Sequence, residues 1–266
     1  MPNENWEKMV LPEKLRARED LYKRLVELAR EECRRVDQHF HAMERYEQCF
    51  LQLFAKQVGC ARAVLLLSDE GLIEHALASH RNLLEVTINM AYSLKHDVEE
   101  PMRRYDDWIN WEVIRRIERE KPDPKTNKER VAAVKADLLT RYSTDELKRM
   151  ERKGPFPGSL WDRAKDIDWL DKYESSYRTL SRNVHVVDVS ELSSIEDMWG
   201  AEAFGRMMAV RLRHIWNEGF MCLGSMLLVV DAMFEGGLKE QVQALLDESK
   251  ALKVDKGSLG KDSPPA

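Results

Sequence analysis

The chain of 266 residues has few of the residues that make turns, with only 12 glycines and 9 prolines. A β-sandwich, or an array of strands alternating with helices, would need many more turn signals. The glycines and prolines cluster at a few places, and charged residues make up 33% of the chain. We therefore predict an all-α protein, a multi-helix bundle with long antiparallel helices.

Cysteine is also scarce, and its spacing fits no zinc site and no C-x-x-C pair. The four cysteines are Cys33, Cys49, Cys60 and Cys222. The pairs His39/His41 and His75/His80 are two and five residues apart, so their side chains diverge on a helix. No phosphate-binding glycine loop is present. The sequence thus predicts no metal and no cofactor, and reduced thiols as in a cytoplasmic protein.

A long hydrophobic run and a strongly basic composition are missing as well. The N-terminus has no apolar segment of the kind found in signal peptides. The longest apolar stretch, Phe220 to Val230, is shorter than the roughly 20 residues that a membrane-spanning helix needs. The net charge of −5 excludes a uniformly basic nucleic-acid-binding surface but not a local basic face. We expect a cytoplasmic protein that makes no contact with a membrane.

A helical pattern begins at Pro12 and continues to about Gln57. It fits either one long helix or two helices with a break near Phe40. Its early part, Glu13 to Arg35, is charged nearly all round, and we expect it to be solvated on most sides. A second helix is expected from about Cys60 to His96, with a local break at Gly71.

Later segments follow the same pattern and are separated by clear breaks. The strongest break is the run Gly-Pro-Phe-Pro-Gly at residues 154–158. Further helices are expected from Pro101 to before Pro122, from Glu129 to Arg141, after the capping-box pair Ser143 and Glu146, near Trp161 to Ile167 and Trp169 to Val184, and over Ile195 to Phe234 and Leu238 to Leu252.

This pattern suggests three parts. They are a charged N-terminal helix (residues 1–39), a helical core domain (residues 40–235), and a C-terminal helix with a disordered tail (residues 236–266).

The segment from Leu72 to Leu94 carries a polar stripe beside its apolar face, formed by Glu74, Arg81, Glu85 and Tyr92. Arg81 and Glu85 are four residues apart and can pair directly. The stripe is either an ordinary boundary with a salt bridge or the wall of a pocket in which Glu85 holds Arg81. His80 lies near the centre of the apolar face, where a hydrogen-bonded core histidine is commoner than a catalyst.

A second group of polar residues lies between Tyr173 and His185. If this segment stays helical, Arg178, Arg182 and His185 cluster on one side, together with Ser181. Histidine moves protons near neutral pH, and arginine binds phosphate and stabilises developing charge. Such a pair can cleave RNA without a metal, because the 2′-hydroxyl of RNA serves as nucleophile. The plainer interpretation is a helix end, with Arg182 and His185 near the C-terminal carbonyls.

Two stretches together resemble a known family. Residues 79–85 (SHRNLLE), continuing into residues 89–92 (NMAY), and residues 173–185, which end in SRNVH, are similar to the two signatures of a bacterial helical family of unknown function. That family pairs an R-x-x-x-E helix with a later Tyr…Ser…His helix. More distantly it resembles the HEPN superfamily of helical domains in toxin–antitoxin, abortive-infection and RNA-cleaving systems. The resemblance covers roughly Arg62 to Val187.

HEPN nucleases carry the motif R-x(4–6)-H, and six residues separate Arg178 from His185. Thr179 stands where these nucleases usually have a more polar residue, and Arg34 with His39 satisfies the same pattern in a helix that we consider structural. The resemblance implies a dimer in which Arg178 binds the scissile phosphate and His185 acts as general acid and base. The residues that would support them are Arg81, Glu85, Tyr177, Arg182 and His80.

Two functions remain open on the sequence. One is a metal-independent endoribonuclease of HEPN type in phage defence or a stress response, acting on RNA as a homodimer. The other is a non-catalytic helical module that binds a protein partner or a small ligand. The group of Arg178, Arg182 and His185 favours the nuclease, and the acidic net charge favours the module.

Overall fold

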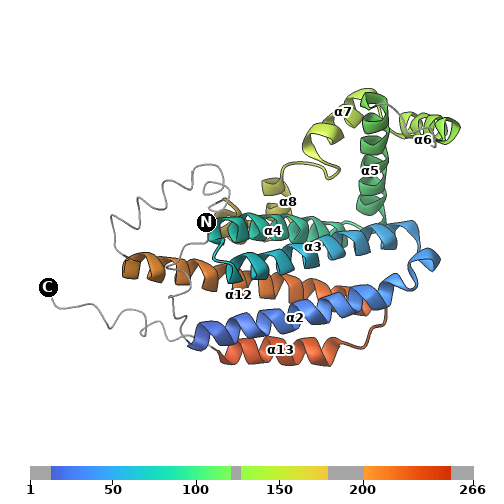
Figure 1. Ribbon diagram of the computed structural model, residues 1–266. Helices are drawn as coiled ribbons and strands as arrows, with labels where there is room; N and C mark the ends of the chain where they lie inside the picture. Colours follow the sequence, from blue (N-terminus) through green and yellow to red (C-terminus); the bar gives the residue numbers. More distant parts are fainter. Residues whose placement is uncertain (1–12, 121–126, 179–200, 253–266) are drawn as a thin grey trace. The chain divides into compact units, whose positions relative to one another are not determined.

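The computed structural model describes residues 13–120, 127–178 and 201–252, with side chains from residue 207 onward in the last range. Within these ranges the protein consists of helices and contains no strand (Figure 1). The predicted all-α class is therefore confirmed. Arg182, His185 and the expected disordered tail lie outside the described residues.

The chain forms two compact units. Unit 1 comprises residues 1–38, 54–87 and 174–266, and unit 2 comprises residues 39–53 and 88–173. This grouping differs from the division expected at residues 39 and 235, because the N-terminal and C-terminal helices share unit 1 with the central part of the chain.

In unit 1 the helices α2 (Glu13–Asp37), α12 (Ala201–Met233) and α13 (Lys239–Ala251) pack against one another (Figure 1). Residues 13–35 are exposed or partly exposed over much of their surface, as expected, but one face of the helix is buried. The reason is a narrow apolar stripe between the charges, which α12 and α13 cover. The buried side chains of α2 are Leu15, Leu21, Tyr22, Leu25, Val26, Ala29, Glu32 and Val36.

The chain breaks near Phe40, where a short 3₁₀ turn, η1 (Phe40–Ala42), separates α2 from α3 (Arg45–Asp69). Of the two alternatives, two helices with a break is therefore the correct one. The helix expected to begin near Cys60 begins instead at Arg45, because Gly59 is accommodated inside α3. The break expected at Gly71 is confirmed: Gly71 has a φ of 72°, and α4 (Ile73–Lys95) follows it.

Unit 2 contains α5 (Glu99–Arg119), α6 (Lys128–Arg141), α7 (Thr144–Lys153), α8 (Leu160–Asp166) and α9 (Leu170–Lys172). Helix α5 packs against α6 and α7 around a small apolar core of Trp111, Ile114, Leu138, Tyr142, Leu147 and Met150. The capping box of Ser143 and Glu146 at the start of α7 is confirmed. A second capping box, Ser159 with Asp162, starts α8 after the Gly-Pro-rich break.

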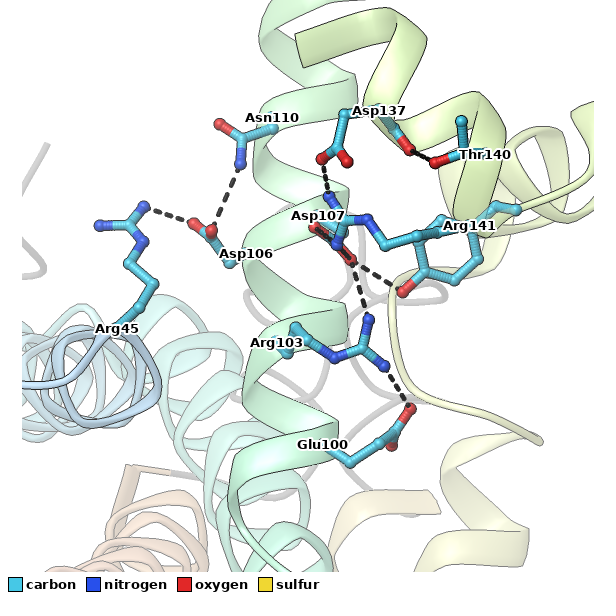
Figure 2. A network of polar contacts seen from close by, with 10 residues as sticks. Arg45, Glu100, Arg103, Asp106, Asp107, Asn110, Asp137, Thr140 and Arg141 are labelled. Atoms are coloured by element: carbon cyan, nitrogen blue, oxygen red, sulfur yellow. Dashed lines mark hydrogen bonds and ion pairs between the residues drawn. The ribbon is translucent and has the colours of Figure 1, made fainter.

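A buried carboxylate joins α5 to α6 (Figure 2). The Asp107 side chain is 3% exposed and accepts hydrogen bonds from the Arg141 guanidinium, with one N–O distance of 2.6 Å, and from the Tyr142 hydroxyl at 2.8 Å. Arg103 approaches Asp107 to 3.9 Å from the same helix. Burial and the neighbouring carboxylate raise the pKa of Tyr142 to about 12. The hydroxyl therefore stays protonated and donates to Asp107 at physiological pH.

Two helical segments, Arg45–Asp69 and Met207–Met233, are long and apolar enough to cross a membrane by length and composition alone. Within their most apolar windows, 50% and 61% of the residues are buried inside the protein. Core helices of folded domains pass the same test. Length and composition therefore do not distinguish a membrane-spanning helix from a core helix here.

Candidate functional site

Four polar side chains from three elements of unit 1 meet in a histidine–carboxylate cluster. His80 comes from α4, Ser176 from the π-helical turn η2 (Tyr173–Tyr177), and His214 and Glu218 from α12. The carboxylate of Glu218 is bonded on both sides: its Oε2 lies 2.9 Å from His80 Nε2, and its Oε1 lies 2.8 Å from Ser176 Oγ. Ser176 Oγ also lies 3.1 Å from His214 Nε2.

The local structure explains how these side chains come together. His214 and Glu218 are four residues apart and therefore project from the same face of α12. His80 lies on the apolar face of α4 and is fully buried, as expected of a core histidine. Ser176 is 1% exposed on η2, and π-helical turns are frequent at functional sites.

Burial controls the protonation of the cluster. It lowers the pKa of His80, and the Glu218 carboxylate offsets only part of this effect, so His80 is a neutral imidazole at neutral pH. Burial alone would raise the pKa of Glu218, but hydrogen bonds from His80 and Ser176 hold it below its ordinary value. The two hydrogen bonds remain when His80 is neutral. Glu218 is therefore an ionised, acceptor-only carboxylate.

The hydrogen-bonding pattern assigns the tautomer of His214. Since ionised Glu218 accepts the proton of Ser176, Ser176 Oγ must accept the bond from His214 Nε2–H. Nδ1 of His214 then carries the lone pair, and the side chain is 51% exposed. His214 is thus a solvent-accessible base whose ring is oriented by buried partners. Its Nε2 also lies 3.6 Å from Glu218 Oε2.

A second group of residues adjoins the cluster in sequence and centres on Tyr177. Arg81 Nη2 donates to the Tyr177 hydroxyl at 2.8 Å, and the guanidinium carbon lies 4.8 Å from the ring centroid. The hydroxyl in turn donates to Glu85 at 3.5 Å. The structure thus brings together three of the predicted supporting residues, with the tyrosine hydroxyl between Arg81 and Glu85.

The remaining residues of the predicted stripe lie elsewhere. Glu74 pairs with Arg211 of α12 at 2.8 Å in unit 1. Tyr92 belongs to unit 2, where its ring lies 4.4 Å from that of His96. Glu74 and Tyr92 therefore have partners other than Tyr177, and the pocket wall stays a prediction.

Arg178, the predicted phosphate ligand, is 55% exposed directly after η2 and forms an ion pair of 2.7 Å with Glu174. His185 and Arg182 lie outside the described residues, so their proximity to Arg178 stays a prediction. His214 and Glu218 were not singled out from the sequence, and Ser176 was included only as part of the segment 173–185. The only local signal was the spacing of His214 and Glu218, which is common on helix surfaces.

The described residues contain no group of three or more His, Cys, Asp or Glu side chains arranged to hold a metal ion. None of the four cysteines forms a disulfide within the described residues. Burial raises the pKa of Cys33 and of Cys49 to about 11, so these two thiols are protonated at neutral pH.

Acidification should destabilise the protein through His80. Its pKa in the folded state lies below the ordinary value of 6.5, so below that pH the unfolded chain binds more protons than the folded one. The stability that neutral His80 contributes is complete above pH 6.5 and is lost as the pH falls toward the folded pKa. Glu218 and His214 face His80, and Glu218 stays ionised in this window.

Urea unfolding between about pH 7.5 and 5.5 measures this effect, since ordinary histidines titrate in this range. The wild type should lose more unfolding free energy than His80→Gln, which keeps an N–H donor but does not titrate. His75→Gln, at an exposed position of α4, should retain the wild-type pH slope. An equal slope in wild type and His80→Gln would contradict the assignment.

Comparison with known proteins adds one finding. The model of a family of unknown function (DUF5677) matches residues 47–198. No curated protein and no solved structure matches the chain. The matched range includes His80 and Ser176, and ends before His214 and Glu218 of the same cluster.

Proposed function

We propose that this chain, which belongs to the DUF5677 family of unknown function, is a metal-independent ribonuclease in which His214 acts as general base. One observation carries the proposal: a half-exposed imidazole is held by buried Ser176 and ionised Glu218, with its basic nitrogen free of hydrogen bonds to described residues. A positioned histidine of this kind contributes roughly 100-fold or more to proton-transfer reactions.

The proposed reaction is an internal transesterification. Nδ1 of His214 takes the proton of the ribose 2′-hydroxyl, and the 2′-oxygen attacks phosphorus. The bond from phosphorus to the 5′-oxygen breaks, and His185 gives the leaving oxygen its proton. The products are a 2′,3′-cyclic phosphate and a free 5′-hydroxyl. The role of His185 comes from the resemblance to HEPN nucleases.

The surrounding residues support this chemistry. Glu218 stabilises the imidazolium that forms when His214 is protonated, and Ser176 fixes the orientation of its ring. Arg178 is exposed and can bind the phosphate once that group displaces Glu174. His80 stays neutral and buried, so it positions Glu218 and does not touch the substrate. Arg81, Glu85 and Tyr177 hold the turn that carries Ser176, and Arg182 supports Arg178.

The resemblance to HEPN domains also supports a cellular role and an oligomeric state for the proposed nuclease. The protein would act in the cytoplasm as a homodimer, in phage defence or a stress response, where RNA cleavage stops growth. The exposed positions of Arg178 and His214 are compatible with access by a large substrate.

Cleavage of single-stranded RNA by the purified full-length chain in EDTA tests the proposal. We expect products that end in a 2′,3′-cyclic phosphate, and no cleavage of the same sequence with 2′-deoxyribose. His214→Ala should reduce the rate by about 100-fold, and His185→Ala and Arg178→Ala should also reduce it. His75→Ala, an exposed histidine of α4, is the matched control and should leave the rate unchanged.

Thermal melting of each variant must stay close to the wild type, so that a lost rate reports chemistry and not unfolding. Unchanged cleavage by both His214→Ala and His185→Ala would refute the assignment. Cleavage that depends on an added metal ion would refute the mechanism.

The alternative is a non-catalytic helical module that binds a protein partner or a small ligand. The burial of His80 and Ser176 favours it, because a cluster that cross-links α4, η2 and α12 also has a purely structural use. No cleavage of any RNA, together with lower melting temperatures for Glu218→Gln and Ser176→Ala, would support this module.

A further inference from the structure

One face of α5 in unit 2 forms an open groove of about 390 Å³, lined by residues between Trp108 and Glu120. Trp108, Ile109 and Val113 supply its apolar surface, and the Val113 side chain is 37% exposed. The groove thus presents apolar surface on α5.

The charged residues of α5 differ in whether they form ion pairs within unit 2. Arg115 and Arg119 both form ion pairs within unit 2, with Glu118 and Glu151. Glu112 and Arg116, which line the groove one turn apart, form no ion pair within the part of the chain that the structure describes, although their spacing would allow one. Two opposite charges beside an apolar patch are therefore available to a partner.

We propose that the partner is a second copy of this chain, whose α5 packs antiparallel in the same groove. A two-fold axis midway between residues 112 and 116 places Glu112 opposite Arg116 of the partner subunit, and Arg116 opposite Glu112 of the partner subunit. The pair forms twice, so the face is complementary in charge to itself. The two Val113 side chains then lie near the axis, within roughly 3 Å of each other along the helix direction.

The size of the face determines the strength of the contact. A single face of about three helical turns buries less than the roughly 800 Å² per partner of a standard interface. We therefore expect reversible association in the micromolar range. The proposal does not depend on ribonuclease activity, and its test measures only whether the chain is a monomer or a dimer.

Sedimentation velocity of the full chain between about 1 and 100 µM tests the proposal, since this range brackets a weak interface. Val113→Lys should raise the dissociation constant by at least about tenfold, because it buries two ammonium groups near the axis. Glu112→Arg and Arg116→Glu should each weaken association, since each places two like-charge pairs across the interface. The double variant, Glu112→Arg with Arg116→Glu, exchanges the signs and should restore the wild-type constant.

Lys148→Glu, at an exposed position of α7, is the control for a change of net charge and should leave association unchanged. Melting of each variant checks that unit 2 stays folded. A monomer over the whole range, a dimer that survives Val113→Lys, or a double variant as weak as the single ones would each overturn the proposal.

Discussion

Asp107→Ala is expected to lower the free energy of unfolding by about 3 kcal/mol, because it leaves a partly buried Arg141 without its main partner. The same change removes the acceptor of the Tyr142 hydroxyl, which then lies unsatisfied in the core between α5 and α6. This loss of unfolding free energy is at the lower end of the range for a broken buried ion pair, because Arg141 keeps access to water and to Asp137. Urea unfolding measures it.

Asp137 supplies the second carboxylate on Arg141 (Figure 2). Asp137→Ala is the matched control, because the Asp137 side chain is 61% exposed. Exposed pairs contribute about 0–1 kcal/mol, so its loss should be small. Asp107→Asn keeps the shape of the side chain and loses its charge. Its loss of unfolding free energy should lie between those of Asp107→Ala and Asp137→Ala. If Asp107→Ala and Asp137→Ala proved equally mild, the buried carboxylate would not be what joins α5 to α6.

Gly219→Ala should destabilise the packing of α2 on α12 by roughly 2 kcal/mol. A β-carbon at this position would lie 2.5 Å from the Tyr22 hydroxyl and 2.9 Å from its ring carbon Cζ. Tyr22 is fully buried, so its ring has little room to move aside. The overpacking should exceed the gain of about 1 kcal/mol that alanine normally brings to a helix interior.

Gly59→Ala is the control, because no described atom beyond the chain neighbours and the nearby backbone of α3 itself lies within 4 Å of the β-carbon it would add. This variant should be more stable than the wild type by up to about 1 kcal/mol. Combining Gly219→Ala with Tyr22→Phe removes the closest atom and should recover part of the loss, as a double-mutant cycle would show. A stabilising Gly219→Ala would mean that α2 and α12 are less closely packed than described.

The helical class and several boundaries could be read from local sequence. Near Phe40 the sequence allowed either a continuous helix or a break, but the break at Gly71 and the capping box of Ser143 each depend on residues within one turn of one another. Such signals act over a few residues, so a single sequence contains them in full. The burial of His80 could also be read from its place on the apolar face of α4.

Only part of the candidate site could be predicted from the sequence. Tyr177, Arg81 and Glu85 were singled out because they lie in segments that resemble a known family, and they do meet. His214, Glu218 and, by itself, Ser176 were not singled out, because each is an ordinary helix residue until its neighbours are known. Ser176 and Glu218 are separated by 42 positions, and His80 and Glu218 by 138.

The sequence by itself determined that this protein is helical and where most of its helices end, since hydrogen bonding within a helix and the capping of its ends are local. Only the tertiary structure decided which faces of those helices are buried and which charges are paired. The highly charged α2 is a core helix because α12 and α13 cover its narrow apolar stripe. Glu218 is an ionised, partly buried carboxylate because α4 and η2 bring His80 and Ser176 to it. Burial and pairing depend on contacts between distant segments, and these contacts arise only when the helices pack.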